Sequence, residues 1–458
     1  MLARGLLTLF FLAAMLRAQE VGGNTALMEK VLARLDALEQ QNQELLNEIR
    51  ELRRELAVAK VQPEGAAHAS AAAAPKEAQG ESVEERLEVA EHRIAEQAQT
   101  KVEASQKLPI QMNGMLLFNS FWNGNAGPAS YTNTSNYFVS GPASAGGTIR
   151  QSLLGFDFNG PTVLDGGKVT GQLSLDFFGG ANPLYGEPRI RRGVISIDWQ
   201  DRSFLAGQDR LLVAQRSPTS LAEVSIPALS GAGNLWIWVP QARYEERRQI
   251  GSSSGIRVQT SIVQTYERYA QAPGSYTGTL EPARPGGEAR VEIWHRWGES
   301  NRVELASAIH RSTTHVGGLS VPSFLYSFDG LLRPARWLEF TGTYFSGENL
   351  GPLSGPALSF VSYEGDAYPL RGEGGWLQST FFLTRRLSVN AFGGWQATLA
   401  RPTLIGLQNS TTGFAGNFIY RLGPNVLASA EAGQYRYAFL LGHPLLRNHY
   451  DLALAYLF

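Results

Sequence analysis

The feature that most constrains this chain is an apolar alternation with a period of two residues, which begins after Leu108 and continues to the last residue. Residues 167–178 show it clearly, with one face made of Val169, Gly171, Leu173, Leu175 and Phe177 and the other of Lys168, Thr170, Gln172, Ser174 and Asp176. Successive side chains of a β-strand point to opposite faces, so this segment predicts a strand with one apolar and one polar face.

Segments of this kind predict about sixteen strands, near 110–122, 149–159, 167–178, 190–199, 202–208, 235–247, 255–269, 288–297, 301–311, 323–332, 336–345, 375–384, 386–397, 412–421, 425–437 and 447–458. None of the later segments offers the roughly 18 uninterrupted apolar residues of a membrane-spanning helix. A soluble β-sandwich would also alternate, with its apolar face inward.

The connections between these segments favour a membrane barrel over a sandwich. Short ones, such as 199–202 and 422–425, alternate with long ones near 123–148, 209–234, 270–287, 346–374 and 398–411. Outer-membrane barrels have short periplasmic turns and longer external loops. We therefore expect an all-β transmembrane barrel of about 16 antiparallel strands over 108–458, with both of its ends on the periplasmic side.

The first 107 residues have a different character. Residues 1–18 are typical of a signal peptide, with Arg4 before a short apolar stretch and Ala18 at the cleavage point. The alternative is a single membrane anchor, but the apolar run has about half of the ~20 residues that a span needs.

Residues 24–60 predict a coiled coil. Its a positions are Met28, Leu35, Asn42, Ile49 and Leu56, and its d positions are Val31, Leu38, Leu45 and Leu52. Asn42 in this seam would fix the register of the helices at a cost in stability. Leu32 and Leu46 widen the apolar stripe and favour a homotrimer, with a dimer as the alternative; a lone amphipathic helix would not sustain the pattern over this length.

Two further segments join the coiled coil to the barrel. Residues 61–80 are rich in Ala, Pro and Gly and predict a flexible linker, and residues 81–107 predict a second helix.

The chain has no Cys, which excludes disulfides and cysteine chemistry.

Charge divides the chain as well. Residues 1–107 carry a net charge of −4, whereas 108–458 carry 27 basic and 24 acidic residues, a net charge of +3. All but one of these 27 bases are arginines, and a guanidinium matches the geometry of carboxylates and phosphates. High-GC codon usage would also favour arginine, and the sequence leaves both explanations open.

Alternation assigns a set of cations to the polar lumen of the barrel. These pore-lining candidates are Lys168, Arg192, Arg257, Arg290, Arg296 and Arg302, accompanied by the acidic Asp198, Glu292 and Glu304. Rings of arginine in a narrow pore attract anions. The connection 209–234 carries Arg210 and Arg216 and is apolar enough to fold inward and narrow the pore; it could equally cover the mouth or contact a neighbouring subunit.

Enzyme signatures are absent from the sequence, including Gly-x-Ser-x-Gly, the P-loop and His-Glu-x-x-His, so we expect no catalysis and no cofactor. His310 and His315 are five residues apart and would lie on opposite faces of a strand, which does not favour a metal site. No basic run interleaved with aromatic residues indicates nucleic-acid binding.

The C-terminal segment alternates aromatic and apolar residues and ends in Tyr456-Leu457-Phe458. This ending resembles the signal by which bacterial outer-membrane proteins engage the barrel-assembly machinery, and Tyr456 and Phe458 would carry it.

Together, the signal peptide, the coiled-coil arm, the arginine-rich barrel and the final Phe458 resemble the DcaP-like porins. The resemblance implies a trimeric porin in outer-membrane lipid, with a periplasmic helical arm, that passes small anionic solutes such as dicarboxylates. The alternative is a structural tether: 37 helical residues at ~1.5 Å each would extend roughly 55 Å toward peptidoglycan, with the barrel as anchor.

Overall fold

The computed structural model describes residues 110–124, 142–180, 186–264, 285–316, 319–399, 408–439 and 443–458. The chain divides into two compact units, Met1–Leu108 and Pro109–Phe458. The predicted signal peptide, coiled coil with Asn42, linker and second helix all lie outside the described residues.

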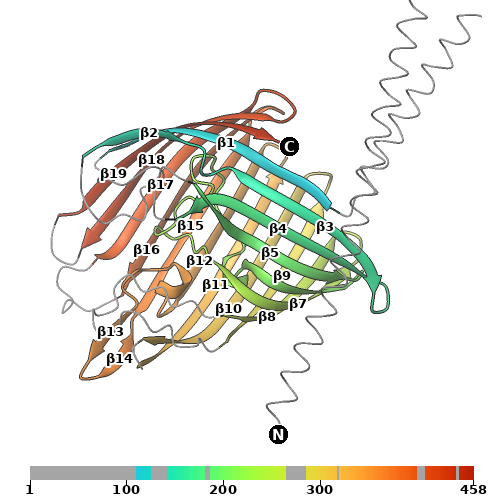
Figure 1. Ribbon diagram of the computed structural model, residues 1–458, viewed down its shortest axis with the longest axis horizontal. Helices are drawn as coiled ribbons and strands as arrows, with labels where there is room; N and C mark the ends of the chain where they lie inside the picture. Colours follow the sequence, from blue (N-terminus) through green and yellow to red (C-terminus); the bar gives the residue numbers. More distant parts are fainter. Residues whose placement is uncertain are drawn as a thin grey trace, which may run out of the picture. The chain divides into compact units, whose positions relative to one another are not determined.

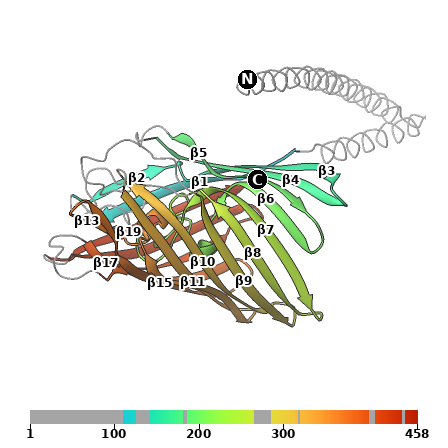
Figure 2. The ribbon, with the colours of Figure 1, turned by 90° about the horizontal axis from the view of Figure 1, so that it is seen from below.

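The second unit is a closed antiparallel barrel (Figures 1 and 2). Its strands are β1 (Ile110–Gly124), β2 (Ser144–Thr148), β3 (Leu153–Val163), β4 (Gly167–Gly179), β5 (Glu187–Asp198), β6 (Arg202–Arg210), β7 (Trp238–Ile250), β8 (Ser254–Val263), β9 (Gly286–Trp297), β10 (Asn301–Val316), β11 (Leu319–Ala335), β12 (Leu338–Glu348), β15 (Arg371–Phe382), β16 (Leu387–Thr398), β17 (Gln408–Arg421), β18 (Val426–Phe439) and β19 (Leu445–Leu457). From β3 onward each strand in this order pairs with the next, β1 pairs with both β2 and β3, and β1 pairs with β19 from Met115↔Leu457 to Gly124↔Asn448 to close the ring.

The wall has sixteen strand positions among the described residues, because β2 and β3 pair with successive parts of β1 and share one position. The sixteen predicted strands are confirmed. The sequence did not anticipate the break between β2 and β3, nor the small hairpin of β13 (Phe360–Tyr363) and β14 (Asp366–Pro369) inside the connection 346–374. Figure 1 shows this hairpin at one end of the barrel.

The two ends of the barrel differ as the sequence predicts. One end has tight turns, such as Leu164-Asp165-Gly166, whose φ angles of 43°, 58° and 87° are all left-handed. Such turns match the twist of paired strands, and glycine adopts this conformation without strain. The other end includes the long connections 211–237 and 349–370, each with one 3-10 turn, η1 (Leu212–Ala214) and η2 (Gly351–Leu353).

The barrel is apolar outside and polar inside. On β1, Phe118 and Trp122 are about half exposed, at 49% and 56%, while Asn119 and Asn123 on the opposite face are fully buried. On β19, Leu452 and Leu454 are exposed and Asp451 is buried. This order is the reverse of a soluble core, and an outer surface so rich in exposed apolar side chains requires a non-aqueous neighbour.

No helix among the described residues has the length and apolar character needed to cross a membrane.

Candidate functional site

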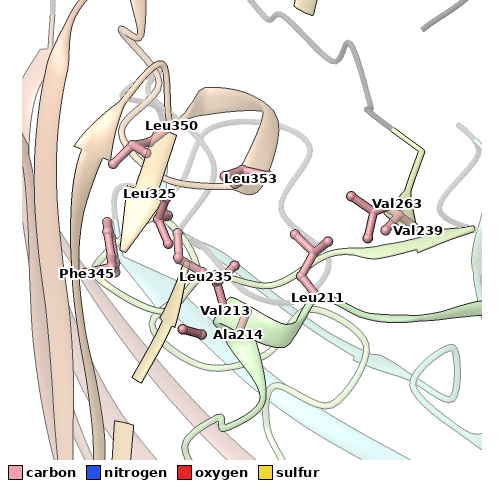
Figure 3. Close-up of a cluster of buried hydrophobic side chains, with 11 residues drawn as sticks. Leu211, Val213, Ala214, Leu235, Val239, Val263, Leu325, Phe345, Leu350 and Leu353 are labelled. Carbon is pink, nitrogen blue, oxygen red and sulfur yellow. The ribbon is translucent and has the colours of Figure 1, made fainter. Parts of the chain in front are cut away.

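The connection between β6 and β7, residues 211–237, folds back into the barrel; we call it the inner loop. Its first and last parts pack on the inner wall in one apolar cluster, made of Leu211, Val213, Ala214, Leu235, Val239, Val263, Ala308, Leu325, Phe345, Leu350 and Leu353. Figure 3 shows these side chains together, with Leu350 and Leu353 contributed by the 349–370 connection. Two loops from one end of the barrel therefore share a single apolar cluster.

The tip of the inner loop, residues 219–229, packs on a different part of the wall. Leu221 joins Met115, Leu117, Ala453 and Ala455 of β1 and β19. Ala228 and Leu229, with Ala232 beyond the tip, join the aromatic rings of Trp376, Phe392, Tyr435 and Tyr437. The loop therefore crosses the interior from the β8–β12 side to the β15–β19 side.

One glycine makes this crossing possible. Gly233 has a φ of +103° and lies so close to the wall that an added Cβ would overlap the carbonyl oxygen of Gly375 on β15. Its backbone N–H donates to Gln396 Oε1 on β16, at 3.3 Å. Only glycine combines this backbone conformation with so close an approach.

Charges hold the beginning of the inner loop. Arg216 donates to Asp329 Oδ1 at 2.7 Å and to Glu304 Oε2 at 2.9 Å, and the buried Arg290 pairs with Asp329 and with Glu292. We call these five residues the ionic anchor. Burial would lower the pKa of Arg216, but its hydrogen bonds and charge pairs with Glu304 and Asp329 outweigh burial and raise that pKa. Both arginines are thus held by carboxylates.

A second hydrogen-bond chain secures the same end. Glu288 accepts from the backbone N–H of Leu212 at 2.8 Å, and its other oxygen lies 3.0 Å from His310 Nδ1. His310 Nε2 lies 2.9 Å from Ser312 Oγ. The order Ser–His–Glu resembles a catalytic triad, but here Glu288 and His310 are buried in the wall and the carboxylate fastens η1. These hydrogen bonds therefore do not indicate a catalytic triad.

In the described part of the chain, three carboxyl groups at the loop tip have no cation as an ion-pair partner. Glu223 of the loop accepts from Tyr435 OH at 3.1 Å, Glu431 of β18 accepts from Ser220 Oγ at 2.6 Å, and Asp451 of β19 accepts from Asn119 Nδ2 at 3.0 Å. We call Glu223, Glu431, Asp451 and Tyr435 the carboxyl anchor. Burial, followed by the charge of Glu431, raises the pKa of Glu223 well above its ordinary value.

Neutral amides complete the contact between the tip and the wall. Gln151 donates to Ala222 O at 2.6 Å and accepts from the backbone N–H groups of Val224 and Ser225 at 2.8 and 3.1 Å. Asn417 donates to both Thr219 O and Glu431. These bonds satisfy backbone groups that the irregular loop would otherwise bury without partners.

Two polar cavities open along the inner wall toward the tight turns. The larger, of about 810 Å³, is lined by Gln200, Asp201, Arg247, Arg248, Gln249, Arg257, Glu292, Trp294, Arg296, Arg302, Val303 and Glu304; we call it the arginine cavity. The smaller, of about 440 Å³, includes Asp157, Gln172, Arg192, Asp198, Arg243, Glu245 and Arg247 in its lining. Five arginines face three carboxylates in the first, whereas the second holds three of each.

The predicted pore cations fall into two groups. Arg192, Arg257, Arg290 and Arg302 all pair with carboxylates, at Asp209, Glu292, Asp329 and Glu304 respectively. Arg296 instead stacks on Trp294, 5.3 Å from the ring centre, is exposed, and has no ion pair within the described residues. Lys168 is exposed and lies opposite Asp198 in the register of β4 and β5.

The remaining predicted residues also have definite places. Arg210 donates to Ser217 Oγ at 2.7 Å and to Gln215 O at 3.4 Å, both within the β6–β7 connection. Tyr456 faces outward and stacks with Phe458, whose backbone bonds to Gly114 help close the ring. No group of acidic, histidine or cysteine side chains in the described part of the chain can hold a metal ion, and the side chain of His315 lies outside that part.

Sequence reasoning missed an arginine cluster on β5. Arg189 pairs with the fully buried Asp176 at 2.6 Å and donates to Ser225 O of the inner loop at 2.8 Å. Arg189 and Arg191 lie over the ring of Trp238, at 5.5 and 4.9 Å. A register shift between β4 and β5 at Ser174/Leu175 breaks the simple alternation here. The run Arg189–Arg192 was the available signal, but a period of two cannot place a bulged segment.

Comparison with solved structures places this barrel among the porin folds. The DcaP outer-membrane channel of Acinetobacter baumannii matches with a TM-score of 0.63 and 15% identity, over 76% of this chain and 97% of that chain. The barrel is similar in fold to the DcaP channel. The expected resemblance to DcaP is thus confirmed at the level of the fold.

Two further solved structures have the same fold. The anion-selective porin of Comamonas acidovorans has a TM-score of 0.51 and 9% identity, over 76% of this chain and 99% of that chain. OprB of Pseudomonas putida has a TM-score of 0.51 and 8% identity, over 78% of this chain and 96% of that chain. No family model matches the sequence, and no curated protein sequence does so either.

Proposed function

We propose that this protein is an outer-membrane porin that assembles as a trimer and allows passive diffusion of small hydrophilic anions such as dicarboxylates. Its apolar outer face would lie in lipid and its polar inner face would line a water-filled passage, as in barrels of this strand number. The widened apolar stripe of residues 24–60 supports the trimer.

The observation that carries the anionic preference is the arginine cavity. Its five arginines exceed its three carboxylates, and Arg296 is exposed with its guanidinium on Trp294 rather than on an acid. A cation that is already paired attracts a passing anion weakly, because the partner carboxylate cancels its field. Arg296 is therefore the strongest single attractor for a solute carboxylate among the predicted pore arginines.

The paired arginines have another role in this proposal. Arg216 and Arg290 both pair with Asp329, and the Arg216 pair fixes the inner loop to the wall. They shape the passage, whereas Arg296 and the cationic excess around it attract anions. The similarity in fold to an anion-selective porin supports the same preference.

The test is the reversal potential of the purified protein in a planar lipid bilayer under a KCl gradient. We expect the wild-type protein to favour chloride and Arg296→Gln to reduce that preference. Arg311→Gln is the matched control, since Arg311 is an exposed β10 arginine whose neighbours in register are Gly287 and Phe324, outside both cavities. A cation-preferring wild type, or equal effects of the two substitutions, would disprove the assignment. A barrel that conducts no ions would favour the tether.

A further inference from the structure

Three carboxyl groups share the interface between the loop tip and the wall. Glu223, Glu431 and Asp451 are 3%, 5% and 5% exposed, and they come from the inner loop, β18 and β19. All their hydrogen-bond donors are neutral. Glu223 accepts from Tyr435, Glu431 accepts from Ser220 and Asn417, and Asp451 accepts from Asn119. No arginine, lysine or histidine forms an ion pair with any of them within the described residues.

Other titratable groups near this interface do not supply the missing charge. On β18, Tyr437 packs with the loop tip and lies beneath Arg447 of β19, at 5.5 Å. His449 of β19 bonds to Asn123 at 2.5 Å, and Arg189 of β5 pairs with Asp176 and donates to the backbone oxygen of Ser225. The three carboxyls do not form a metal site either, because no metal-holding group occurs in the described residues.

Buried carboxylates of like charge cannot all ionise in one place at low cost. When protonated, a carboxyl group remains a hydrogen-bond partner without a charge, so the interface is stable as it stands. When ionised, Glu223 and Glu431 repel each other across the contact between loop and wall. The only covalent attachments of the tip are its two chain ends, so separation of the tip relieves this repulsion.

We propose that the loop tip, residues 219–229, is a proton-operated latch that closes on β18 and β19 when the carboxyl anchor is protonated and opens as rising pH ionises it. On closing, protons come from the solvent, and on opening they return to it. The raised pKa of Glu223 agrees with this direction: a group whose pKa is higher in the closed state stabilises that state at low pH, and the stabilisation is lost as pH rises through the raised value.

The test uses two matched buried alanines of the inner loop in a chain that has no cysteine of its own. Ala222 is 1% exposed at the carboxyl anchor, and Ala214 is 2% exposed next to the ionic anchor. Ala222→Cys and Ala214→Cys are each labelled with a small neutral maleimide between pH 5 and pH 8. The fraction of reactive thiolate rises with pH for both cysteines, and taking the ratio of the two labelling rates cancels this shared increase.

We expect the Ala222→Cys rate to rise relative to the Ala214→Cys rate as pH increases. The scale is about tenfold for each pKa unit by which the carboxyl anchor differs between closed and open states. With Glu223→Gln added to both, the ratio should change less with pH, because one of the ionising groups is gone. A constant ratio in the parent pair, or an unchanged rise with Glu223→Gln, would overturn the latch.

A second measurement needs no substitution. Hydrogen–deuterium exchange of the wild-type protein, followed by mass spectrometry, compares residues 219–229 with residues 211–216 at each pH. We expect protection of 219–229 to fall selectively as pH rises; a parallel change in both segments would overturn the latch. Neither measurement uses solute flux, so they remain decisive even where the protein fails to act as a porin.

Discussion

The inner loop is fastened to the wall at two places by opposite electrostatic solutions. At the ionic anchor, Arg216 and Arg290 pair with Asp329, Glu292 and Glu304, and Arg257 and Arg302 add further cations at Glu292 and Glu304. At the carboxyl anchor, the donors to Glu223, Glu431 and Asp451 among the described residues are all neutral. Arginines neutralise the carboxylates of the first arrangement, whereas only protons can neutralise the second, so the second responds to pH.

This difference assigns different roles to the beginning and the tip of one loop. Ion pairs with several hydrogen bonds hold a fixed geometry and lose much when one partner is removed. A group of carboxyls held by hydrogen bonds from neutral donors is weaker and responds to pH. The ionic anchor therefore keeps the loop inside the barrel. The carboxyl anchor is the contact that we propose opens, so that the loop tip separates from the wall.

The sharpest way to break the comparison is to remove the central cation of the ionic anchor. Arg290→Gln would leave Asp329 and Glu292 buried with one cation fewer, and loss of one partner of a buried ion pair costs about 3–5 kcal/mol. We expect a clear drop in thermal stability, measured by heat-modified electrophoretic mobility. Arg302→Gln, in a half-exposed pair, is the control and should have little effect.

A smaller loss of thermal stability is expected from removing the neutral amide of Gln151, which binds the loop tip. Gln151→Leu removes the acceptor for the N–H groups of Val224 and Ser225 and the donor to Ala222 O. Such groups cost about 1–3 kcal/mol each if they stay dry. Water from the polar interior can reach this irregular loop and restore most of the lost hydrogen bonds, so the net loss is smaller. The same mobility assay should show an effect below that of Arg290→Gln, with faster labelling of Ala222→Cys at every pH. An unchanged labelling rate would contradict the assigned contact.

The pH dependence of stability sharpens the comparison further. Because the pKa of Glu223 is raised, its contribution is present at low pH and is lost as pH rises through the raised value. Wild-type stability should therefore fall between mildly acidic and alkaline pH, and Glu223→Gln should flatten that fall. Glu304→Gln, which alters the ionic anchor, should shift stability by a similar amount at each pH. A pH dependence that is flattened by Glu304→Gln and left unchanged by Glu223→Gln would contradict the contrast between the anchors.

The smallest effect concerns selectivity. Arg296→Gln should lower the anion preference only about twofold, since one exposed charge in a wide aqueous passage is strongly screened. Its stability should match that of the wild type because Arg296 has no ion pair in the described residues. Reversal potentials check the first expectation, and heat-modified mobility checks the second. A large loss of stability would show that Arg296 is structural.

The same contrast explains which residues could be found from the sequence. Wall positions such as Arg257 and Arg302 follow from alternation, and both line the arginine cavity. Arg189 and Arg191 escaped because a bulge shifts the face of β5. The carboxyl anchor escaped because its members are as far apart as Glu223 and Asp451, and nothing local joins them.

What the sequence determined by itself is the barrel. A period of two fixes which face of each strand is apolar, and the alternation of short and long connections fixes antiparallel neighbours, so sixteen strands and their polar interior follow from local rules. Only the tertiary structure decided which of the inward charges are neutralised and by what. That outcome depends on closing the ring and on where residues 211–237 cross it, which brings Arg216 to Asp329 and Glu223 to Glu431. Contacts between residues so distant in the chain exist only once the ring is closed and its register is set.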